Sequence, residues 1–503
     1  MNSDGASPEP DQKSITSAWT LLAWAVIALA ATFIIFFRAP SGPATAAPDP
    51  VDFPDVPLQL VCRQSLGLDL VGQSLGGQFR SALSNPAIVV GTLRDNAGDD
   101  DLARLRIVPV IAEIAGAEQA IAQLDELNAA ARAQRPDEGA APEASSMDEL
   151  AGDQPDPVEQ ADDAGAEGDW SEDLAEDAAI LRRLYVYGHD DLTQAELDRL
   201  KTRHHWFGEL AATWGMETPE RTALLNRAKR GSIAMLTLVT VAIAAGGAGL
   251  VLLILIVIGL FTRRLRPAYP AARVAMARPH SAYLEAMAVF LVLFIGAGLL
   301  GTYLADQGVS HRLVGLLIWV LTPIPVLWPL LRGRPLAEVH LALGLHRGKG
   351  VLREVGWGVI GYMAGLPIVA LGLGVSFLIL NLTGAKPSHP AVDNLAGLQS
   401  LIDLALLYLL ASVWAPVTEE LIFRGAMYTH MRQRCSAIVS ALVVAFLFAA
   451  IHPQGYALVP ALMSLAIVFA LMREFRGSII PCMVAHAIQN TALITVNALM
   501  LMS

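Results

Sequence analysis

TEELIFRGAMY, residues 418–428, is the most informative segment of this sequence. It places Glu419, Glu420 and Arg424 inside an apolar run that covers residues 401–428. Ionisable side chains in a membrane segment are costly and rare, and they commonly mark function. Residues four apart share a helix face, so Glu420 and Arg424 are expected to pair. Glu419 points about 100° away from Glu420 and is therefore free for another task.

Two later apolar segments carry polar groups that match this one. His452 closes the run 437–452, four residues after Phe448. His486 and Asn490 lie in the last run, 478–501, and are again one helical turn apart. Three apolar segments can therefore contribute side chains to one polar site within a membrane.

These three motifs, EExxxR at 419–424, FxxxH at 448–452 and HxxxN at 486–490, resemble those of a known family in type and order. The family is the CPBP family of intramembrane proteases, also called the ABI family. It includes type II CAAX prenyl endopeptidases and bacteriocin-processing or immunity proteins. The resemblance covers residues 347–502, which makes 347–503 a protease-like membrane domain, and it does not extend to residues 1–226. It implies hydrolysis of a peptide bond in a membrane-associated protein or peptide.

The resemblance also implies a role for each motif residue. Glu419 is expected to be the general base, with His452 sharing the attacking water, because desolvation raises the proton affinity of a carboxylate. His486 and Asn490 are expected to donate hydrogen bonds to the oxyanion. Glu420 and Arg424 are expected to pair and to orient their helix.

No cofactor is expected, and two alternatives stay open. The first is a zinc-dependent membrane protease in which His452, His486 and a glutamate hold the metal, although no HExxH motif is present. The second is a non-catalytic immunity or scaffold protein of the same fold, whose polar groups only hold helices together. The intact motifs favour the intramembrane endopeptidase.

The composition agrees with a multi-pass membrane protein. Of 503 residues, 54% are hydrophobic and 16% are charged, and the three cysteines cannot build a disulfide framework. The net charge is −12, but residues 137–177 hold 16 acidic and no basic residues, so the rest of the chain sums to −12 + 16 = +4. No basic patch of the kind that nucleic-acid binding requires is found. The expected partners are the lipid bilayer and a membrane-associated protein or peptide substrate.

The N-terminal half divides by composition. Residues 1–17 form a polar tail, and residues 18–37 an apolar membrane anchor, for which a signal peptide is the alternative. Residues 38–226 are predicted to be a soluble helical region that could recruit substrate or another protein, with a disordered acidic stretch at 137–177. Residues 227–346 are predicted to hold further transmembrane helices.

The overall prediction is an all-α polytopic protein with about nine transmembrane helices, placed in a prokaryotic plasma membrane. The nine apolar runs are 18–37, 232–262, 282–305, 313–331, 355–382, 401–428, 437–452, 457–472 and 478–501. The loops 263–280, 332–353, 430–434 and 473–476 are rich in arginine, which places them in the cytoplasm and residues 39–226 outside. Three cations at 227, 229 and 230 fall on the outer side in this arrangement. His452 ends its run on the outer side whereas Glu419 lies mid-run, so their meeting requires a tilted helix or an early stop at Pro453.

Overall fold

The computed structural model describes residues 12–37, 56–134, 172–269, 280–309, 315, 319–383, 401–452 and 454–502, and these residues form helices and connections without a strand. The chain divides into two compact units. The membrane unit comprises Met1–Thr45 and Leu238–Ala498, and the second unit Ala46–Thr237 with Leu499–Ser503. The all-α prediction is confirmed for the described part of the chain.

Five helical segments are long and apolar enough to cross a membrane, which makes the chain a multi-pass membrane protein. They are Pro219–Phe261, Ala282–Leu304, Val351–Thr383, Leu401–Arg432 and Tyr456–Arg476. Shorter apolar helices cover Ala18–Ile34, Trp319–Leu331 and Ala437–Ala450. The prediction of nine spans is not confirmed. The last predicted span is the 23-residue helix α24 (Ile480–Met502), whose internal His486, Gln489 and Asn490 reduce its apolar character.

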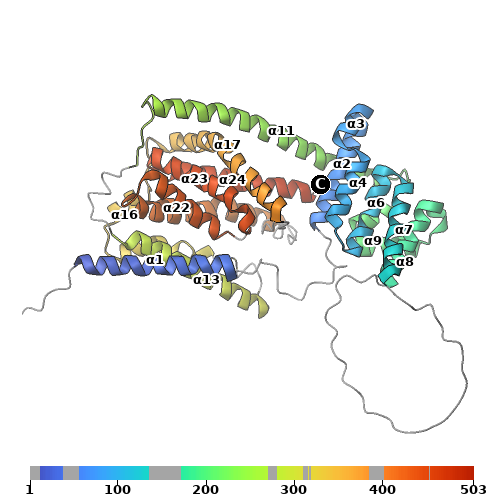
Figure 1. The fold of residues 1–503 in the computed structure, drawn as a ribbon, viewed down its shortest axis with the longest axis horizontal. Coiled ribbons are helices and arrows are strands. Elements are labelled where there is room, and N and C mark those ends of the chain that lie inside the picture. Colours follow the sequence, from blue (N-terminus) through green and yellow to red (C-terminus); the bar gives the residue numbers. More distant parts are fainter. Residues whose placement is uncertain are drawn as a thin grey trace, which may run out of the picture. The chain divides into compact units, whose positions relative to one another are not determined.

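The membrane unit is a bundle in which the later helices gather around α23 (Figure 1). Its further elements, in order, are α1 (Gln12–Phe37), most of α11 (Pro219–Phe261), α13 (Ala282–Asp306), η2 (Ile324–Leu327), α15 (Trp328–Leu331), α16 (Leu336–Ala342), α17 (Val351–Thr383), α19 (Leu401–Leu409), η3 (Leu410–Trp414), α20 (Ala415–Glu420), η4 (Leu421–Met427), α21 (Tyr428–Arg432), α22 (Ala437–Ala450), η5 (Tyr456–Leu458) and α23 (Val459–Arg476).

Helix α17 packs closely on α23 and α24 through its glycines, as its composition predicts. A Cβ atom at Gly358 would lie 2.7 Å from the Cβ of Val484, and one at Gly372 would collide with Ser464. These glycines leave room for the neighbouring helices, so α17 forms one wall of the bundle that holds the motifs.

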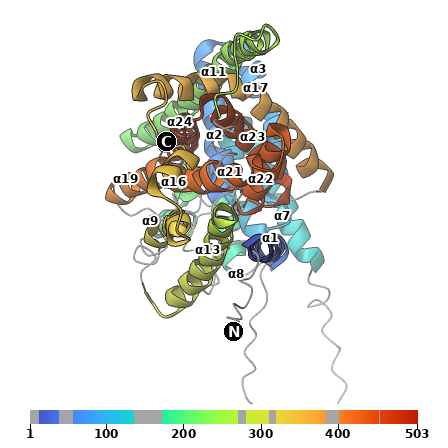
Figure 2. The same cartoon turned by 90° about the vertical axis from the view of Figure 1, so that its left-hand side faces the viewer.

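Helix α1 is part of the same bundle, beside α13 (Figures 1 and 2). It buries one stripe of side chains, namely Ala23, Ile27, Ala30, Ala31 and Ile34. The guanidinium of Arg332 lies 5.0 Å from the ring centroid of Trp19, a cation–π distance. This stripe packs α1 into the membrane unit, and its assignment as an anchor rather than a signal peptide stays a prediction.

The run that carries the EExxxR motif is helical throughout but contains two π-helical turns, η3 and η4. Pro416 gives a reason for the first, because proline has no N–H to donate to the carbonyl of Ser412 and its ring crowds that carbonyl. Such wide turns are rare and are frequently found at functional sites. The second covers Leu421–Met427 and therefore includes Arg424.

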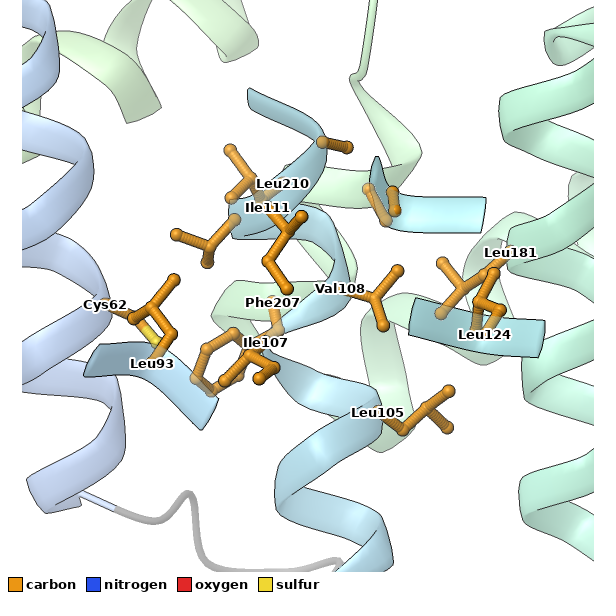
Figure 3. Close-up of a cluster of buried hydrophobic side chains, with 14 of the residues drawn as sticks. Cys62, Leu93, Leu105, Ile107, Val108, Ile111, Leu124, Leu181, Phe207 and Leu210 are labelled. Atoms are coloured by element: carbon orange, nitrogen blue, oxygen red, sulfur yellow. The ribbon is translucent and has the colours of Figure 1, made fainter. Parts of the chain in front are cut away.

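The second unit is a compact set of short helices around its own apolar core (Figure 3). Its elements are α2 (Val56–Leu75), α3 (Gly77–Leu83), α4 (Pro86–Ala97), α5 (Asp101–Arg106), α6 (Val108–Ala115), α7 (Ala117–Gln134), α8 (Glu172–Tyr187), η1 (His189–Asp191), α9 (Gln194–His204), α10 (Trp206–Ala212) and the first part of α11. Cys62, Ile107, Ile111 and Phe207 come together in this core.

The predicted disorder of residues 137–177 is wrong for its last six residues, which begin α8. Asp177 is buried and accepts hydrogen bonds from Arg199 (2.7 Å) and Arg203 (2.9 Å), and His204 lies at 3.0 Å. Burial raises the pKa of the Asp177 carboxyl, but the hydrogen bonds from His204 and Arg199 outweigh it and hold that pKa below its usual range. These tertiary partners order an acidic segment that composition alone marks as disordered. Residues 137–171 lie outside the described residues.

Candidate active site

The motif residues come from three helical segments of the membrane unit. Glu419 and Glu420 end α20, and Arg424 lies in the π-helical turn η4. His452 follows α22, and His486 and Asn490 lie in α24. The structure brings the first five of these six residues into one connected cluster.

Arg424 and Glu420 form the pair that their spacing predicts. Nη1 of Arg424 lies 2.9 Å from Oε1 of Glu420, and both side chains are fully buried. Nη2 of Arg424 also donates to the carbonyl of Ala466 at 3.2 Å. The guanidinium lies 4.5 Å from the ring centroid of Phe448 and 5.1 Å from that of Phe469. The arginine is thus held by a carboxylate, a carbonyl and two aromatic faces.

Glu420 has a second partner that the sequence does not reveal. Its Oε1 lies 2.9 Å from Nδ1 of His486. A carboxylate only accepts hydrogen bonds, so Nδ1 of His486 carries the hydrogen, as assigned from this contact. The ring of Phe469 stacks on His486 with centroids 5.3 Å apart. Glu420 therefore fixes both the tautomer and the orientation of His486.

His452 is oriented by a local contact. Its Nδ1 lies 2.6 Å from the carbonyl oxygen of Phe448, one helical turn earlier, so Nδ1 is the donor. The Phe448 and His452 rings have centroids 4.4 Å apart. This spacing explains the FxxxH pattern: the phenylalanine supplies a carbonyl and a ring that hold the histidine with its Nε2 facing the cluster.

Both histidines of the cluster direct their Nε2 atoms toward the carboxylate of Glu419. Its Oε2 lies 3.8 Å from Nε2 of His452 and 3.9 Å from Nε2 of His486. These separations are too long for direct hydrogen bonds, and Oε2 is buried without a partner among the described residues. In the assigned tautomers all three atoms are acceptors. They are therefore arranged to share a donor, and a water molecule can donate to two acceptors at once.

The short helix α22 explains how His452 reaches Glu419. It has 14 residues and a length of about 21 Å, whereas the hydrocarbon core of a bilayer is about 30 Å thick. The helix is shorter than this core, and its C-terminal end places His452 beside Glu419. Their side chains are 19% and 24% exposed. The site thus lies inside the bundle, but part of the surface of both side chains remains accessible.

Asn490 is placed differently from its predicted role. Its Nδ2 donates to the carbonyl of Ala411 in the π-helical turn η3 at 2.7 Å. No hydrogen bond or ion pair joins it to the glutamates or histidines of the cluster in the described part of the chain. This hydrogen bond connects α24 to η3. The role of Asn490 as a hydrogen-bond donor to the oxyanion stays a prediction.

The donor atoms do not meet the spacing of a zinc site. Zinc ligands at 2.0–2.1 Å in a tetrahedron lie roughly 3.3 Å apart, closer than Glu419 lies to either histidine. Within the described residues no group of three or more histidines, cysteines, aspartates or glutamates is close enough to hold a metal ion.

Arg473 is a second buried arginine that sequence reasoning missed. It is fully buried and donates to the carbonyls of Arg424 (3.1 Å) and Ala342 (2.8 Å). Its guanidinium lies 4.9 Å from the ring centroid of Tyr269. In the sequence it ends an apolar run, where an arginine ordinarily marks a solvated loop. No pattern in the sequence distinguishes a buried arginine at this position from one in a solvated loop.

The fold and this cluster define a multi-pass helical membrane protein with a polar site among its C-terminal helices. Residues 401–492 match the model of the family described as type II CAAX prenyl endopeptidase Rce1-like. The match includes all six motif residues and confirms the resemblance to the CPBP family. This part of the chain is therefore a domain of the CAAX protease type. No significant match links the chain to a curated protein or to a solved structure.

The buried pair gives a stability prediction. Arg424→Ala leaves Glu420 charged and buried, and breaking such a pair costs roughly 3–5 kcal/mol, so the melting temperature of the detergent-solubilised protein should fall clearly. The double change Glu420→Gln with Arg424→Met should recover part of the loss, because it removes both charges while the carbonyl oxygen of the introduced amide can still accept from His486.

Glu419→Gln is the matched control, because Glu419 has no direct hydrogen-bond partner in the described chain and should melt close to the parent. If Arg424→Ala melted like the parent and Glu419→Gln were the unstable variant, the structural and catalytic roles of the two glutamates would be exchanged.

Proposed function

We propose that this protein is a glutamate-dependent intramembrane endopeptidase of the CPBP type, which hydrolyses a peptide bond in a membrane-associated protein or peptide. The observation that carries the proposal is the convergence of Glu419 Oε2 with the Nε2 atoms of His452 and His486 at 3.8 and 3.9 Å. It lies within a domain that matches a peptidase family.

In this proposal Glu419 removes a proton from a water that His452 helps to hold. The resulting hydroxide attacks the carbonyl carbon of the scissile peptide and forms a tetrahedral oxyanion. When the peptide C–N bond breaks, the proton taken up by Glu419 passes to the departing amine, which balances the reaction.

His486 and Asn490 are proposed to stabilise the oxyanion. Glu420 holds the His486 ring through Nδ1, so Nε2 is the atom directed at the site, and this role requires a hydrogen on Nε2 when the oxyanion forms. The amide nitrogen of Asn490 has two hydrogens and donates one to Ala411, so the second is available. Glu420 and Arg424 act as positioning residues, because they touch the histidine and the helices rather than the substrate.

The catalytic prediction concerns Glu419. Purified full-length protein should cleave a membrane-associated peptide, and Glu419→Gln should lower the rate by on the order of 10²-fold or more, because the amide cannot accept the proton. The rate is measured by mass spectrometry of the peptide products in liposomes. Glu118→Gln, an exposed glutamate of the second unit, is the control and should cleave like the parent.

Cleavage by Glu419→Gln at the parental rate would refute the assignment. A parent that cleaves no peptide, with a cellular phenotype that survives Glu419→Ala at normal protein levels, would instead support the non-catalytic immunity or scaffold function. The network of Glu420, Arg424 and His486 is compatible with that alternative, since Arg424 and His486 both bond to Glu420 and thereby join two helical segments.

A second prediction separates the two kinds of water activation. If Glu419 and the histidines activate water unaided, dialysis against a strong chelator should leave the cleavage rate unchanged. Activity that is lost on chelation and restored by Zn²⁺ alone would favour a metalloprotease in which His452, His486 and Glu419 move closer around the ion.

We also propose the nine-span topology, with the arginine-rich loops in the cytoplasm of a prokaryotic cell. It is supported by contacts among these loops at one end of the membrane unit. The amide of Tyr269 donates to the carbonyl of Glu474 at 2.9 Å, and Arg432 pairs with the Glu474 carboxylate at 2.9 Å. His346 lies 3.0 Å from the carbonyl of Gly477. Loops predicted to share one side of the membrane therefore touch one another.

The topology prediction uses single cysteines at exposed positions, in a protein whose three native cysteines are replaced. Asp100→Cys and Gln307→Cys should react with an impermeant thiol reagent added to intact cells, and Arg264→Cys should react only after permeabilisation. Reaction at 264 without reaction at 307 would invert the model.

A further inference from the structure

A group of exposed cations lies near the C-terminal end of α11. These cations have no carboxylate partner in the described chain. Three follow α11, and three lie in the connection from α16 to the start of α17. We call the group the basic rim; its members are Arg263, Arg264, Arg266, Arg347, Lys349 and Arg353, all exposed. No carboxylate in the described chain forms an ion pair with any of them. By contrast, Arg432 and Arg476 at the same end pair with Glu474 and Glu354.

The two halves of the rim are brought together by helix packing. Helix α11 approaches α17 closely at Gly249, which lies against the carbonyl of Met363; Figure 1 shows both helices. The amides of Ala268 and Tyr269, just after the first three cations, donate to the carbonyl of Glu474 near the end of α23. Arg476, at the end of the same helix, pairs at 2.6 Å with Glu354, which is next to the last of the other three cations, so both halves lie at this end of the membrane unit.

Apolar side chains flank these cations. Phe261 is 86% exposed at the end of α11, and Leu352 is 87% exposed within the first turn of α17. Both lie within two residues of a rim cation. Cations next to exposed large apolar side chains are typical of a surface at the membrane interface, where the apolar groups enter the acyl region and the cations meet the headgroups.

We propose that the basic rim binds the headgroups of anionic phospholipids. Clusters of four to eight Lys and Arg beside a transmembrane helix favour such lipids. The guanidinium groups suit phosphate oxygens, and Phe261 and Leu352 add contacts that only a ligand with acyl chains can use. The rim acts independently of the active site, so this inference does not depend on the proposed peptidase function.

The test uses the full-length protein in a non-ionic detergent. Dioleoylphosphatidylglycerol, dioleoylphosphatidylcholine or inorganic phosphate is added, and bound lipid is counted by native mass spectrometry beside the melting temperature. Phosphatidylglycerol should bind saturably and raise the melting temperature, whereas phosphatidylcholine and phosphate should do neither at the same concentration. The triple variant Arg347→Gln, Lys349→Gln, Arg353→Gln should weaken the apparent Kd by on the order of 10²-fold.

The matched control removes three exposed cations from the second unit, by Arg94→Gln, Arg182→Gln and Lys201→Gln, and should bind phosphatidylglycerol like the parent. If the first triple variant fails to fold, Arg263→Gln, Arg264→Gln, Arg266→Gln tests the other half of the rim. Leu352→Ser should weaken lipid binding without a change of charge. Equal binding of phosphatidylcholine, saturation by phosphate alone, parental affinity in the rim variants, or an equal loss in the control would each overturn the proposal.

Discussion

The membrane unit depends on the way it accommodates the fully buried charge of Arg424. An arginine in a bilayer interior is costly unless a counter-charge and polar partners surround it. Here Glu420 supplies the counter-charge, Ala466 a carbonyl, and Phe448 and Phe469 two ring faces. These partners come from α20, α22 and α23. One side chain therefore fixes the mutual positions of three segments that each contribute to the site.

The same pair extends to the fourth segment through Glu420. Its Oε1 meets Arg424 and His486 together, so α24 is held by the carboxylate that neutralises the arginine. Because Glu420 is occupied in this way, its neighbour Glu419 is the carboxylate left facing the two histidines. The two adjacent glutamates have different partners because successive side chains of a helix point about 100° apart.

Sequence patterns predicted what is local in this site. The pairing of Glu420 with Arg424 and the separate direction of Glu419 both follow from geometry within one or two helical turns. The patterns did not reveal the contact of Glu420 with His486, the burial of Arg473 or the bond of Asn490 to Ala411, because each joins residues far apart in the chain. Hydropathy alone also did not establish the number of spans, since the run 437–452 forms a helix of only 14 residues and α24 carries amide side chains within its apolar surface.

The length of α22 connects the fold to the chemistry. A full-length helix would carry its last residue to the membrane surface and separate His452 from Glu419. A helix of 14 residues is shorter than the hydrocarbon core of a bilayer, and its last carbonyls must still find partners or water. The turn that begins there keeps part of His452 and of Glu419 exposed. Backbone at this depth is tolerated where it is buried in protein or lines a wet cavity, so the same early stop that aligns the site also supplies the setting in which water could reach it.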